Sequence, residues 1–520
     1  MNYFKFLIIT FLSLSSAQAQ TSKSPNIIYI LADDMGSGDV KAYNNDCKFP
    51  TPHLDQMVSE GVKFTDTHTS SSVCTPTRYG IVTGRYSWRT SLKKGVTHGL
   101  TEHLIEKGRM TVASYLKTKN YATAIVGKWH MGMDWTSKDG KKLKKTGTNL
   151  DTNAAIKNGP NTFGFDYYFG ISASLNMDPH AYIENDKLLG DLIHIPNDKE
   201  VRKFFGQGGK AGWVDKNFKR DEVMQTFTDK AIAWMEATHE KDAKKPFFLY
   251  FPLNAPHSPI VPSDKFKGKS KLSPHGDFCM DVDDTVGQII SAVEKMGISD
   301  NTLIVFTADN GVSPAAKLEP MEAKGHFSSY IYRGVKGTLY EGGHRVPFIV
   351  KWPKVIKKAF ETDYLNCTTD LLATVVDIHG DKLPENAGED SVSFLPLLKG
   401  IKKTDADRDA IVHHSDAGVF SLRKGKWKII FDKKGGSRRT DPKDKPVINP
   451  GNIQLFDMEK DIEESTNIAA SYPKLVEELS QLMGKIMSEG RSTSGKKQAY
   501  VPYEQKFQKL LDPFRNYIYQ

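Results

Sequence analysis

The chain has 520 residues, of which 39% are hydrophobic and 26% are charged. This balance is typical of a soluble globular protein, and the length is too great for one simple core, so we expect one large domain and a smaller one. The formal net charge is +9, but the lysines are scattered and no nucleic-acid-binding motif is present. We therefore expect no nucleic-acid partner, and the charge fits a soluble surface as well as it fits a polyanionic ligand.

The first predicted element is an export signal at residues 1–19. Lys5 provides the positive start, residues 6–14 form a short apolar run, and residues 17–19 (Ala-Gln-Ala) form a small-x-small cleavage site. The apolar run is too short to cross a bilayer, and no later segment is apolar enough to do so. The sequence therefore predicts an exported protein, periplasmic or secreted, without a membrane span.

Short apolar strands alternate with amphipathic helices through most of the chain. We predict strands at residues 26–31, 121–126, 246–251 and 302–307. We predict helices that begin near Pro52 and Pro76, and further helices at residues 112–119, 222–240 and 278–296. This alternation predicts an α/β fold in which helices wrap a large mixed, mainly parallel sheet. The Lys/Gly/Asn-rich residues 137–160 are interpreted as a surface insertion.

The sequence pattern changes after Gly400. Residues 419–423, 427–431 and 454–456 have the pattern of short antiparallel strands, and residues 472–487 have the pattern of a helix. We therefore predict a main α/β domain at residues 20–404 and a smaller C-terminal α+β domain at residues 405–520.

Polar side chains follow four of the predicted strands, at the point where each strand ends. They are Asp33 and Asp34, Lys128 and His130, His257, and Asp309 and Asn310. Open α/β sheets place their ligands at this edge. The acidic and amide side chains offer hard oxygen ligands, which suit Ca²⁺ or Mg²⁺ better than zinc. Each pair taken alone would be typical of a turn or a helix cap.

Cys74 begins the run Cys-Thr-Pro-Thr-Arg, which ends at Arg78 and is followed by Ile-Val-Thr-Gly-Arg at residues 81–85. Pro76 fits the first turn of a helix because it lacks an N–H and has a preset φ. Cys74 would then lie just before that helix, beside unpaired N–H groups that favour an anion. The alternative is a buried structural cysteine before a helix that begins with proline.

The Cys74 run resembles the signature of the type I, formylglycine-dependent sulfatases of the alkaline-phosphatase-like superfamily. Residues 121–130 (Tyr-Ala-Thr-Ala-Ile-Val-Gly-Lys-Trp-His) are similar to a second sulfatase signature. The chain departs from it at Asn120, where glycine is usual, but asparagine tolerates the left-handed conformation. Residues 334–337 and 341–347 resemble the lysine segment of the family, and residues 455–457 with Asn467 resemble its C-terminal domain.

The resemblance implies a modified residue and a metal. A formylglycine-generating enzyme would oxidise Cys74 to formylglycine (3-oxoalanine) before or during export, and water would convert this aldehyde to a geminal diol. One calcium ion would be held by Asp33, Asp34, Asp309, Asn310 and the modified Cys74. Three other cysteines (Cys47, Cys279 and Cys367) would then remain, so at least one would stay free, and the spacings show no disulfide framework.

The resemblance also implies roles for the basic residues. Arg78, Lys128 and His130 would hold and activate the formylglycine, while His257 and Lys336 would contact the sulfate and the leaving oxygen. A sulfate ester loses a poor leaving group, so a general acid such as His257 is valuable. The lysines, Arg78 and calcium would offset charge on the sulfuryl oxygens. His130 would then take a proton from the second diol hydroxyl, which expels sulfate and restores the aldehyde.

The sequence therefore predicts an exported sulfatase that acts on sulfated polysaccharide or oligosaccharide. The substrate would be an algal glycan such as ulvan or carrageenan, or a 6-sulfated glycosaminoglycan. Asn176, Asp178 and His180 are candidate substrate-binding residues, and the Trp88–Arg89 pair lines the pocket or flanks a helix. Two alternatives remain: a phosphodiesterase or phosphonate monoester hydrolase of the same superfamily, and a non-catalytic protein that binds sulfated glycan.

Overall fold

The computed structural model describes residues 24–401 and 408–518. The predicted export signal at residues 1–19 lies outside this part of the chain, and so does the predicted domain boundary between residues 404 and 405. Both stay predictions. None of the helices in the described part combines the length and the apolar composition that a membrane crossing requires.

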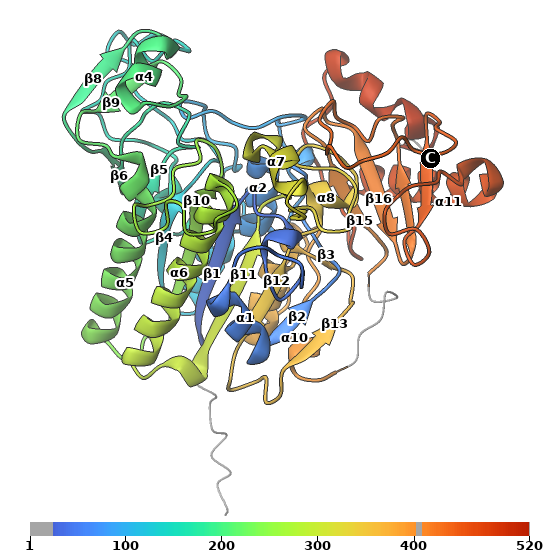
Figure 1. Cartoon of the computed structure of the whole chain (residues 1–520), viewed down its shortest axis with the longest axis horizontal. Helices are drawn as coiled ribbons and strands as arrows, with labels where there is room; N and C mark the ends of the chain where they lie inside the picture. The colour runs from blue at the N-terminus through green and yellow to red at the C-terminus, as the bar shows by residue number, and fades with distance from the viewer. Residues whose placement is uncertain (1–23, 402–407, 519–520) are drawn as a thin grey trace, which may run out of the picture.

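A ten-stranded sheet forms the centre of the large domain (Figure 1). Its central strands run parallel, as predicted, and are, in sheet order, β11 (Thr302–Ala308), β1 (Asn26–Asp33), β10 (Phe247–Pro256), β4 (Ala122–Lys128) and β5 (Tyr167–Ile171). Beyond β11 lie β12 (Phe348–Lys351), β2 (Val62–Phe64) and β13 (Phe360–Thr362), and beyond β5 lie β6 (Ile183–Glu184) and β7 (Lys187–Leu188). Among these outer strands, β13 runs parallel to its neighbour and the others pair antiparallel.

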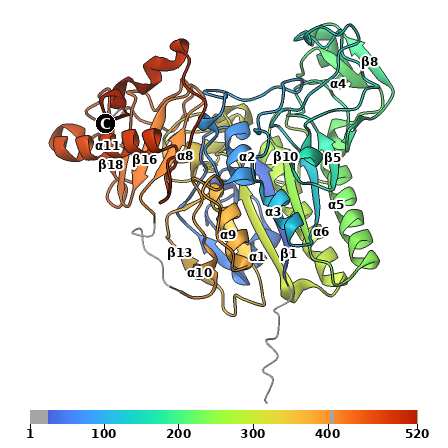
Figure 2. The ribbon, with the colours of Figure 1, turned by 180° about the vertical axis from the view of Figure 1, so that it is seen from behind.

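Helices cover both faces of this sheet. One face packs against α1 (Pro52–Ser59), α5 (Val223–Lys241) and α6 (Pro274–Lys295), which stand in front in Figure 1. The opposite face, seen in Figure 2, packs against α2 (Cys74–Thr83), α3 (Val112–Thr118), α9 (Leu371–Ile378) and α10 (Leu395–Leu398). The central strands are buried on both sides, which explains why they are almost continuously apolar in sequence.

Strand β1 illustrates this double burial. Ile28 and Ile30 belong to the core on one face, whereas Ile27, Tyr29 and Leu31 belong to the core on the other. The strand is therefore packed on both sides up to Asp33, which is itself buried.

At the ends of the elements, one sequence detail is confirmed and one is corrected. Asn120 has φ 64°, the left-handed conformation that its place in the second signature requires. Helix α6 begins at Pro274, earlier than predicted, because the Ser273 side chain accepts a hydrogen bond from the backbone N–H of Gly276 and caps the helix.

A lobe that the sequence analysis did not predict rises beyond the carboxyl edge of the sheet, at the upper left of Figure 1. It contains the two-stranded sheet of β8 (Leu192–Ile195) and β9 (Gly212–Asp215), and helix α4 (Asp198–Phe205). Short elements elsewhere are α7 (Leu318–Glu322), α8 (Glu341–His344), and the parallel pair β3 (Thr67–His68) and β14 (Asn366–Cys367).

The C-terminal part forms a four-stranded antiparallel sheet, at the right of Figure 1. Its strands are β15 (Ile411–His414), β16 (Phe420–Lys424), β17 (Trp427–Ile430) and β18 (Gln454–Asp457), and the helices after it are α11 (Pro473–Glu489) and α12 (Arg515–Ile518). The last three strands and α11 confirm the sequence prediction. β15 was missed because two of its four residues are histidines.

Trp88 and Arg89 pack against this C-terminal part rather than lining a substrate pocket. Trp88 is fully buried, with its ring edge-on to Phe420 at 5.4 Å. The Arg89 guanidinium forms a buried ion pair with Asp390 at 2.8 Å. The pocket interpretation of this pair is therefore wrong, because both side chains are enclosed by core and ion-pair partners.

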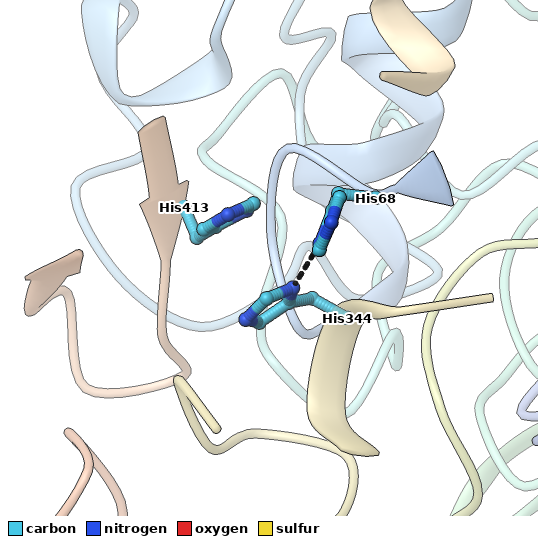
Figure 3. Close-up of side chains that lie close together, drawn as sticks. All are labelled: His68, His344 and His413. Atoms are coloured by element: carbon cyan, nitrogen blue, oxygen red, sulfur yellow. Dashed lines mark hydrogen bonds between the residues drawn. The ribbon is translucent and has the colours of Figure 1, made fainter. Parts of the chain in front are cut away.

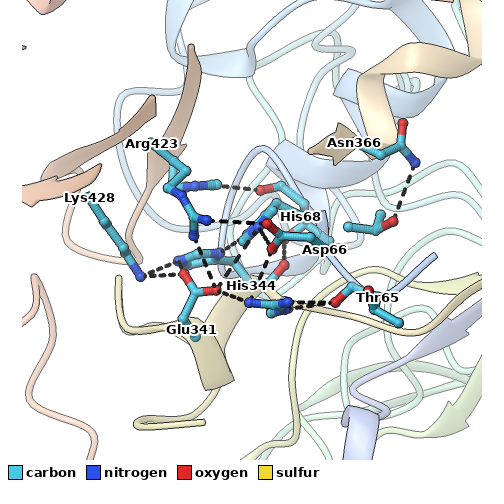
Figure 4. A network of polar contacts seen from close by, with 12 residues as sticks. Thr65, Asp66, His68, Glu341, His344, Asn366, Arg423 and Lys428 are labelled. Carbon is cyan, nitrogen blue, oxygen red and sulfur yellow. Dashed lines mark hydrogen bonds and ion pairs between the residues drawn. The ribbon is translucent and has the colours of Figure 1, made fainter. Parts of the chain in front are cut away.

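A buried polar network joins the large domain to the C-terminal sheet (Figure 4). Glu341 of α8 accepts a hydrogen bond from the ammonium of Lys428 in β17 at 2.8 Å, and both side chains are fully buried. Asp66 pairs with Arg423 of β16 at 3.2 Å. Because these ion pairs are buried, each partner depends on the other for compensation of its charge.

Three histidines lie within this network (Figure 3). Nδ1 of His68 and Nδ1 of His344 are 3.0 Å apart, and the rings of His344 and His413 stack with centroids 3.8 Å apart. Burial lowers the pKa of all three imidazoles, so each is uncharged at neutral pH. Two stacked rings cannot both hold one ion in their planes, so we interpret this cluster as polar packing and not as a metal centre.

We expect Glu341→Gln to destabilise the fold by about 3–5 kcal/mol, because it leaves the buried Lys428 without a full counter-charge. Urea unfolding measures this loss. The matched control is Glu361→Gln, since Glu361 pairs with Lys63 at 2.8 Å but is 60% exposed, and its loss should cost at most about 1 kcal/mol. Equal small effects of the two variants would show that the network does not stabilise the junction.

Candidate active site

Four neighbouring strands end at one edge of the sheet and bring the predicted site residues together. β11, β1, β10 and β4 lie side by side in that order. Ala32 pairs with Ala308, and Asp33 pairs with Pro256, so the residues that follow these strands emerge at the same level. The edge is also where the N-terminus of α2 arrives, with Cys74 as its first residue.

Cys74 is 2% exposed and surrounded by charged groups. Its Sγ lies 3.1 Å from the Lys336 ammonium and 3.6 Å from Oδ1 of Asp33. Burial and the Asp309 carboxylate raise the pKa of the Cys74 thiol to about 12. An unmodified thiol here is therefore protonated at neutral pH and a poor nucleophile.

Two carboxylates are held by basic side chains. Arg78 donates two hydrogen bonds to Oδ2 of Asp309, at 2.9 and 2.7 Å, and Lys128 donates one to Oδ2 of Asp33 at 2.7 Å. Burial acts to raise the pKa of Asp33, but Lys128, His257 and Arg78 overcome it and hold this pKa well below its usual value. Burial and the neighbouring Asp33 raise the pKa of Asp309 to about 6.

The oxygen atoms at this edge fit a hard divalent cation. Oδ2 of Asp34 and Oδ1 of Asn310 are both buried, and neither has a hydrogen-bond partner among the described residues. The Asn310 amide donates to Oδ1 of Asp34 at 2.7 Å, which turns its own carbonyl oxygen away as a free acceptor. With Asp33 and Asp309 these residues form an all-oxygen set that suits Ca²⁺ or Mg²⁺. Lys336 forms an ion pair with Asp34.

His130 follows β4, and a hydrogen bond to the backbone defines which of its ring nitrogens carries the proton. Nε2 donates to the carbonyl of Thr97 at 2.9 Å, whereas Nδ1 is buried without a partner among the described residues. Burial, Lys128 and Arg78 lower the pKa of His130 well below its usual value. His130 therefore presents an unprotonated Nδ1, as a general base must.

His257 directly follows β10 and lies close to Asp34. Its Nε2 is 3.7 Å from Oδ2 of Asp34, and its Nδ1 donates to the Ser258 carbonyl. Burial lowers the pKa of His257 to about 4, against the opposing effect of the Asp34 carboxylate. The side chain is 12% exposed, so it can meet a ligand that enters from solvent.

Lys336 reaches the site from a loop and not from a strand. Its backbone N–H donates to the carbonyl of Val312 at 2.9 Å, which fastens the loop to the segment after β11. The three candidate substrate residues lie in the segment after β5 that leads into the lobe. Asp178 is 8% exposed and His180 is 1% exposed, whereas Asn176 lines a cavity.

Sequence reasoning missed two buried polar residues at the same edge. Both amide atoms of Asn254 in β10 lack a partner among the described residues, and so does the hydroxyl of Ser174 after β5. Asn254 could have been found from the sequence, because it is a polar residue within an otherwise apolar run. Ser174 could not have been found in this way, since serine is common after a strand.

Comparison with known proteins identifies the family of this chain. Residues 25–380 match the family model described as Sulfatase. The chain is 33% identical over 509 residues to an N-acetylgalactosamine-6-O-sulfatase of Bacteroides thetaiotaomicron, covering 90% of this chain and 94% of that protein. It is 31% identical over 499 residues to arylsulfatase A of Bos taurus, covering 91% and 89% of the two chains.

A solved structure supports the same assignment. A protein from work on the metabolism of multiple glycosaminoglycans by Bacteroides thetaiotaomicron superimposes with a TM-score of 0.77 at 32% identity, covering 89% of this chain and 99% of that one. The fold and both signatures agree with these similarities. The chain belongs to the sulfatase family and is a sulfuric ester hydrolase.

Proposed function

We propose that this sulfatase hydrolyses sulfate esters on sulfated glycans, with formylglycine at position 74 and one bound calcium ion. The observation that carries the proposal is the composition of one buried cluster. It places Cys74 at a helix N-terminus, beside two unsatisfied oxygen atoms and the cations Arg78, Lys128 and Lys336. A non-catalytic protein that only binds sulfated glycan would not need the cysteine, the metal ligands and the three cations together.

Asp33, Asp34, Asp309 and Asn310 would hold the calcium ion. When bound, calcium supplies positive charge that binds the sulfate oxygens and stabilises the hydrated aldehyde. The protein adds three cations of its own, which offset charge on the sulfuryl oxygens without reorganisation during the reaction. Arg78 also keeps Asp309 oriented through its paired hydrogen bonds.

The two histidines divide the proton transfers between them. His257 would donate a proton to the oxygen of the departing alcohol, and a bound sulfate ester favours its protonated form by adding negative charge nearby. His130 would accept a proton at Nδ1 from the hydroxyl of residue 74 that has not reacted, which allows sulfate to leave. Formation of the nucleophile from Cys74 requires a formylglycine-generating enzyme, and we propose that the mature protein is exported.

The substrate class follows from chain similarity. The relative that shares 33% of its residues with this chain is an N-acetylgalactosamine-6-O-sulfatase, so we propose the 6-sulfate of N-acetylgalactosamine, within a glycosaminoglycan, as the first substrate to test. Algal glycans such as ulvan and carrageenan are the second group.

Parallel turnover assays test the reaction class. Enzyme from a host that makes formylglycine should release sulfate from an aryl sulfate and from 6-sulfated N-acetylgalactosamine oligosaccharides. It should show little activity on an aryl phosphate diester. Preference for the phosphate diester by orders of magnitude would instead assign the chain to phosphodiester chemistry.

His257→Ala should separate good leaving groups from poor ones. For a sugar sulfate we expect kcat/KM to fall by about 10²- to 10⁴-fold, because the alkoxide then departs without a proton. For an activated aryl sulfate the loss should be much smaller. The control is His130→Ala, which should lower kcat to the same value for both substrates, because His130 acts on sulfated residue 74 after the alcohol has left and this intermediate is the same for both. If His257→Ala lowered kcat/KM equally for the sugar sulfate and the aryl sulfate, His257 would not be the general acid.

A further inference from the structure

Two adjoining cavities lie between the lobe and the loop that precedes α6. The smaller, of about 580 Å³, is lined by Ser258 and Pro259, which directly follow His257, and by Asn176. The larger, of about 870 Å³, is lined mainly by residues 204–221 and 260–277. Gln207, Ile260 and Pro274 line both, so the cavities form a continuous groove that begins beside the active site.

The groove carries cations that the protein itself leaves without counter-ions. Arg202, Arg220, Lys271 and Lys317 line it, and none of the four forms an ion pair with a carboxylate among the described residues. The acidic side chains of the groove, in contrast, are engaged. Asp198 pairs with Lys210 at 2.9 Å, and Asp277 accepts from the backbone N–H groups of Gly268 and Ser270.

Arg220 is the most informative of these cations because it is buried. It is 5% exposed, and its Nε has no hydrogen-bond partner among the described residues. Burial lowers the pKa of Arg220 to about 10, and no carboxylate of the described residues forms an ion pair with it. A protein rarely retains a buried guanidinium without an anion, because the desolvation cost is then uncompensated.

The surroundings of Arg220 orient its guanidinium and do not neutralise it. Nη1 donates to the carbonyl of Gly208 at 2.7 Å, and the guanidinium stacks on the ring of Phe205 at 3.8 Å. His180 donates its Nε2–H to the carbonyl of Lys210 at 2.9 Å, so its Nδ1 is an acceptor, 3.4 Å from Nη2 of Arg220. His180 is therefore a positioning residue for Arg220 and not itself a substrate contact.

Gly209 leaves the space that the Arg220 guanidinium occupies. A Cβ at this position would lie 2.5 Å from Nη2 of Arg220 and 2.7 Å from a methyl group of Val201. Only glycine leaves space for the guanidinium where it lies, so the loop is shaped around this cation.

We propose that Arg220 binds an anionic group on a sugar unit other than the one that loses its sulfate, and that the groove accepts a polyanionic oligosaccharide. This inference rests on the proposed function. Both the carboxylate of a uronic acid and a second sulfate match the donor geometry of a guanidinium. The enzyme therefore selects its substrate by acidic groups along the chain as well as by the sulfate at the active site.

The test is a binding measurement that does not depend on turnover. Cys74→Ala protein is titrated calorimetrically with a tetrasaccharide of alternating uronic acid and 6-sulfated N-acetylgalactosamine. Adding Arg220→Met should weaken binding by about 10- to 100-fold, whereas Arg220→Lys should weaken it less. Lys295→Met, an exposed lysine of α6 outside the groove, removes the same net charge and should leave affinity unchanged.

Two modified probes identify the anionic group. If the carboxylate is bound, a carboxyl-reduced tetrasaccharide should bind Arg220→Met and its parent equally well. If Arg220 instead binds a second sulfate, the two proteins should bind with equal affinity a tetrasaccharide that lacks the sulfate on the neighbouring sugar unit. Thermal melting shows whether Arg220→Met is folded, and we expect a small change in Tm, because the variant loses the hydrogen bond to Gly208 but also the desolvation cost of a buried guanidinium. Unchanged affinity of folded Arg220→Met for every probe would overturn the inference, while absence of wild-type turnover would refute the proposed function alone.

Discussion

Cys74→Ala should fold normally and lose turnover of every sulfate ester. We expect kcat to fall by a factor on the order of 10⁴ to 10⁶, the range seen when a nucleophile that works within a catalytic group is removed. Alanine cannot be oxidised to an aldehyde, and the remaining cations and metal ligands can bind the ester but cannot attack it. Release of sulfate from an aryl sulfate over hours measures the residual rate.

Cys74→Ser distinguishes loss of the modification from loss of the side chain. The serine hydroxyl resembles the thiol in size, so binding and folding should be retained, yet turnover should be absent unless the host oxidises serine as well. The control is Cys367→Ser, a buried cysteine of β14 outside the site, which should keep its activity at temperatures where it is folded. Full activity of Cys74→Ser without modification would contradict the role assigned to position 74.

Calcium should stabilise the folded protein strongly, and Asp34→Asn should remove this effect. A ligand at 1,000 times its Kd adds about 4 kcal/mol to the free energy of unfolding, which corresponds to a shift of several degrees in Tm for a large domain. Asp34 has one buried oxygen atom without a described partner, and its charge is needed to attract the ion. Differential scanning fluorimetry with calcium, with magnesium and with a chelator measures the shift.

Asp283→Asn is the matched control for this effect. Asp283 is also buried, but it accepts hydrogen bonds from the backbone N–H groups of His53 and Leu54 at the start of α1. Its loss should lower Tm equally with and without calcium, so the calcium-dependent shift should remain. A wild-type protein whose Tm is the same in calcium and in chelator would show that these oxygen atoms do not form a calcium site.

The sheet and its ligand-binding edge could be predicted because their signals are local. Residues 26–31 form an apolar run that ends in Asp33 and Asp34, and parallel strands bring such ends together wherever they lie in the chain. The lobe could not be predicted in this way. Its strands β8 and β9 are short and half-buried, so their residues lack the continuous apolar pattern of a central strand.

Residues that act through long-range contacts were the least predictable. Lys336 was placed in the site only by resemblance, because it lies in a loop whose position depends on a hydrogen bond to Val312. The place of Arg89 stayed open between two alternatives because its partner, Asp390, is 301 residues away in the sequence. Arg220 gave no signal at all, since an arginine before a helix is ordinary until its burial without a counter-ion is known.

The most direct test of the account is mass spectrometry of the peptide that contains residue 74, taken from purified enzyme with measured sulfatase activity. We predict that this peptide is lighter than the form with unmodified cysteine, because an aldehyde group replaces the methylene and thiol of the side chain. The aldehyde should also react with a hydrazine reagent. A fully active preparation in which every copy of this peptide carries an unmodified thiol would contradict the account.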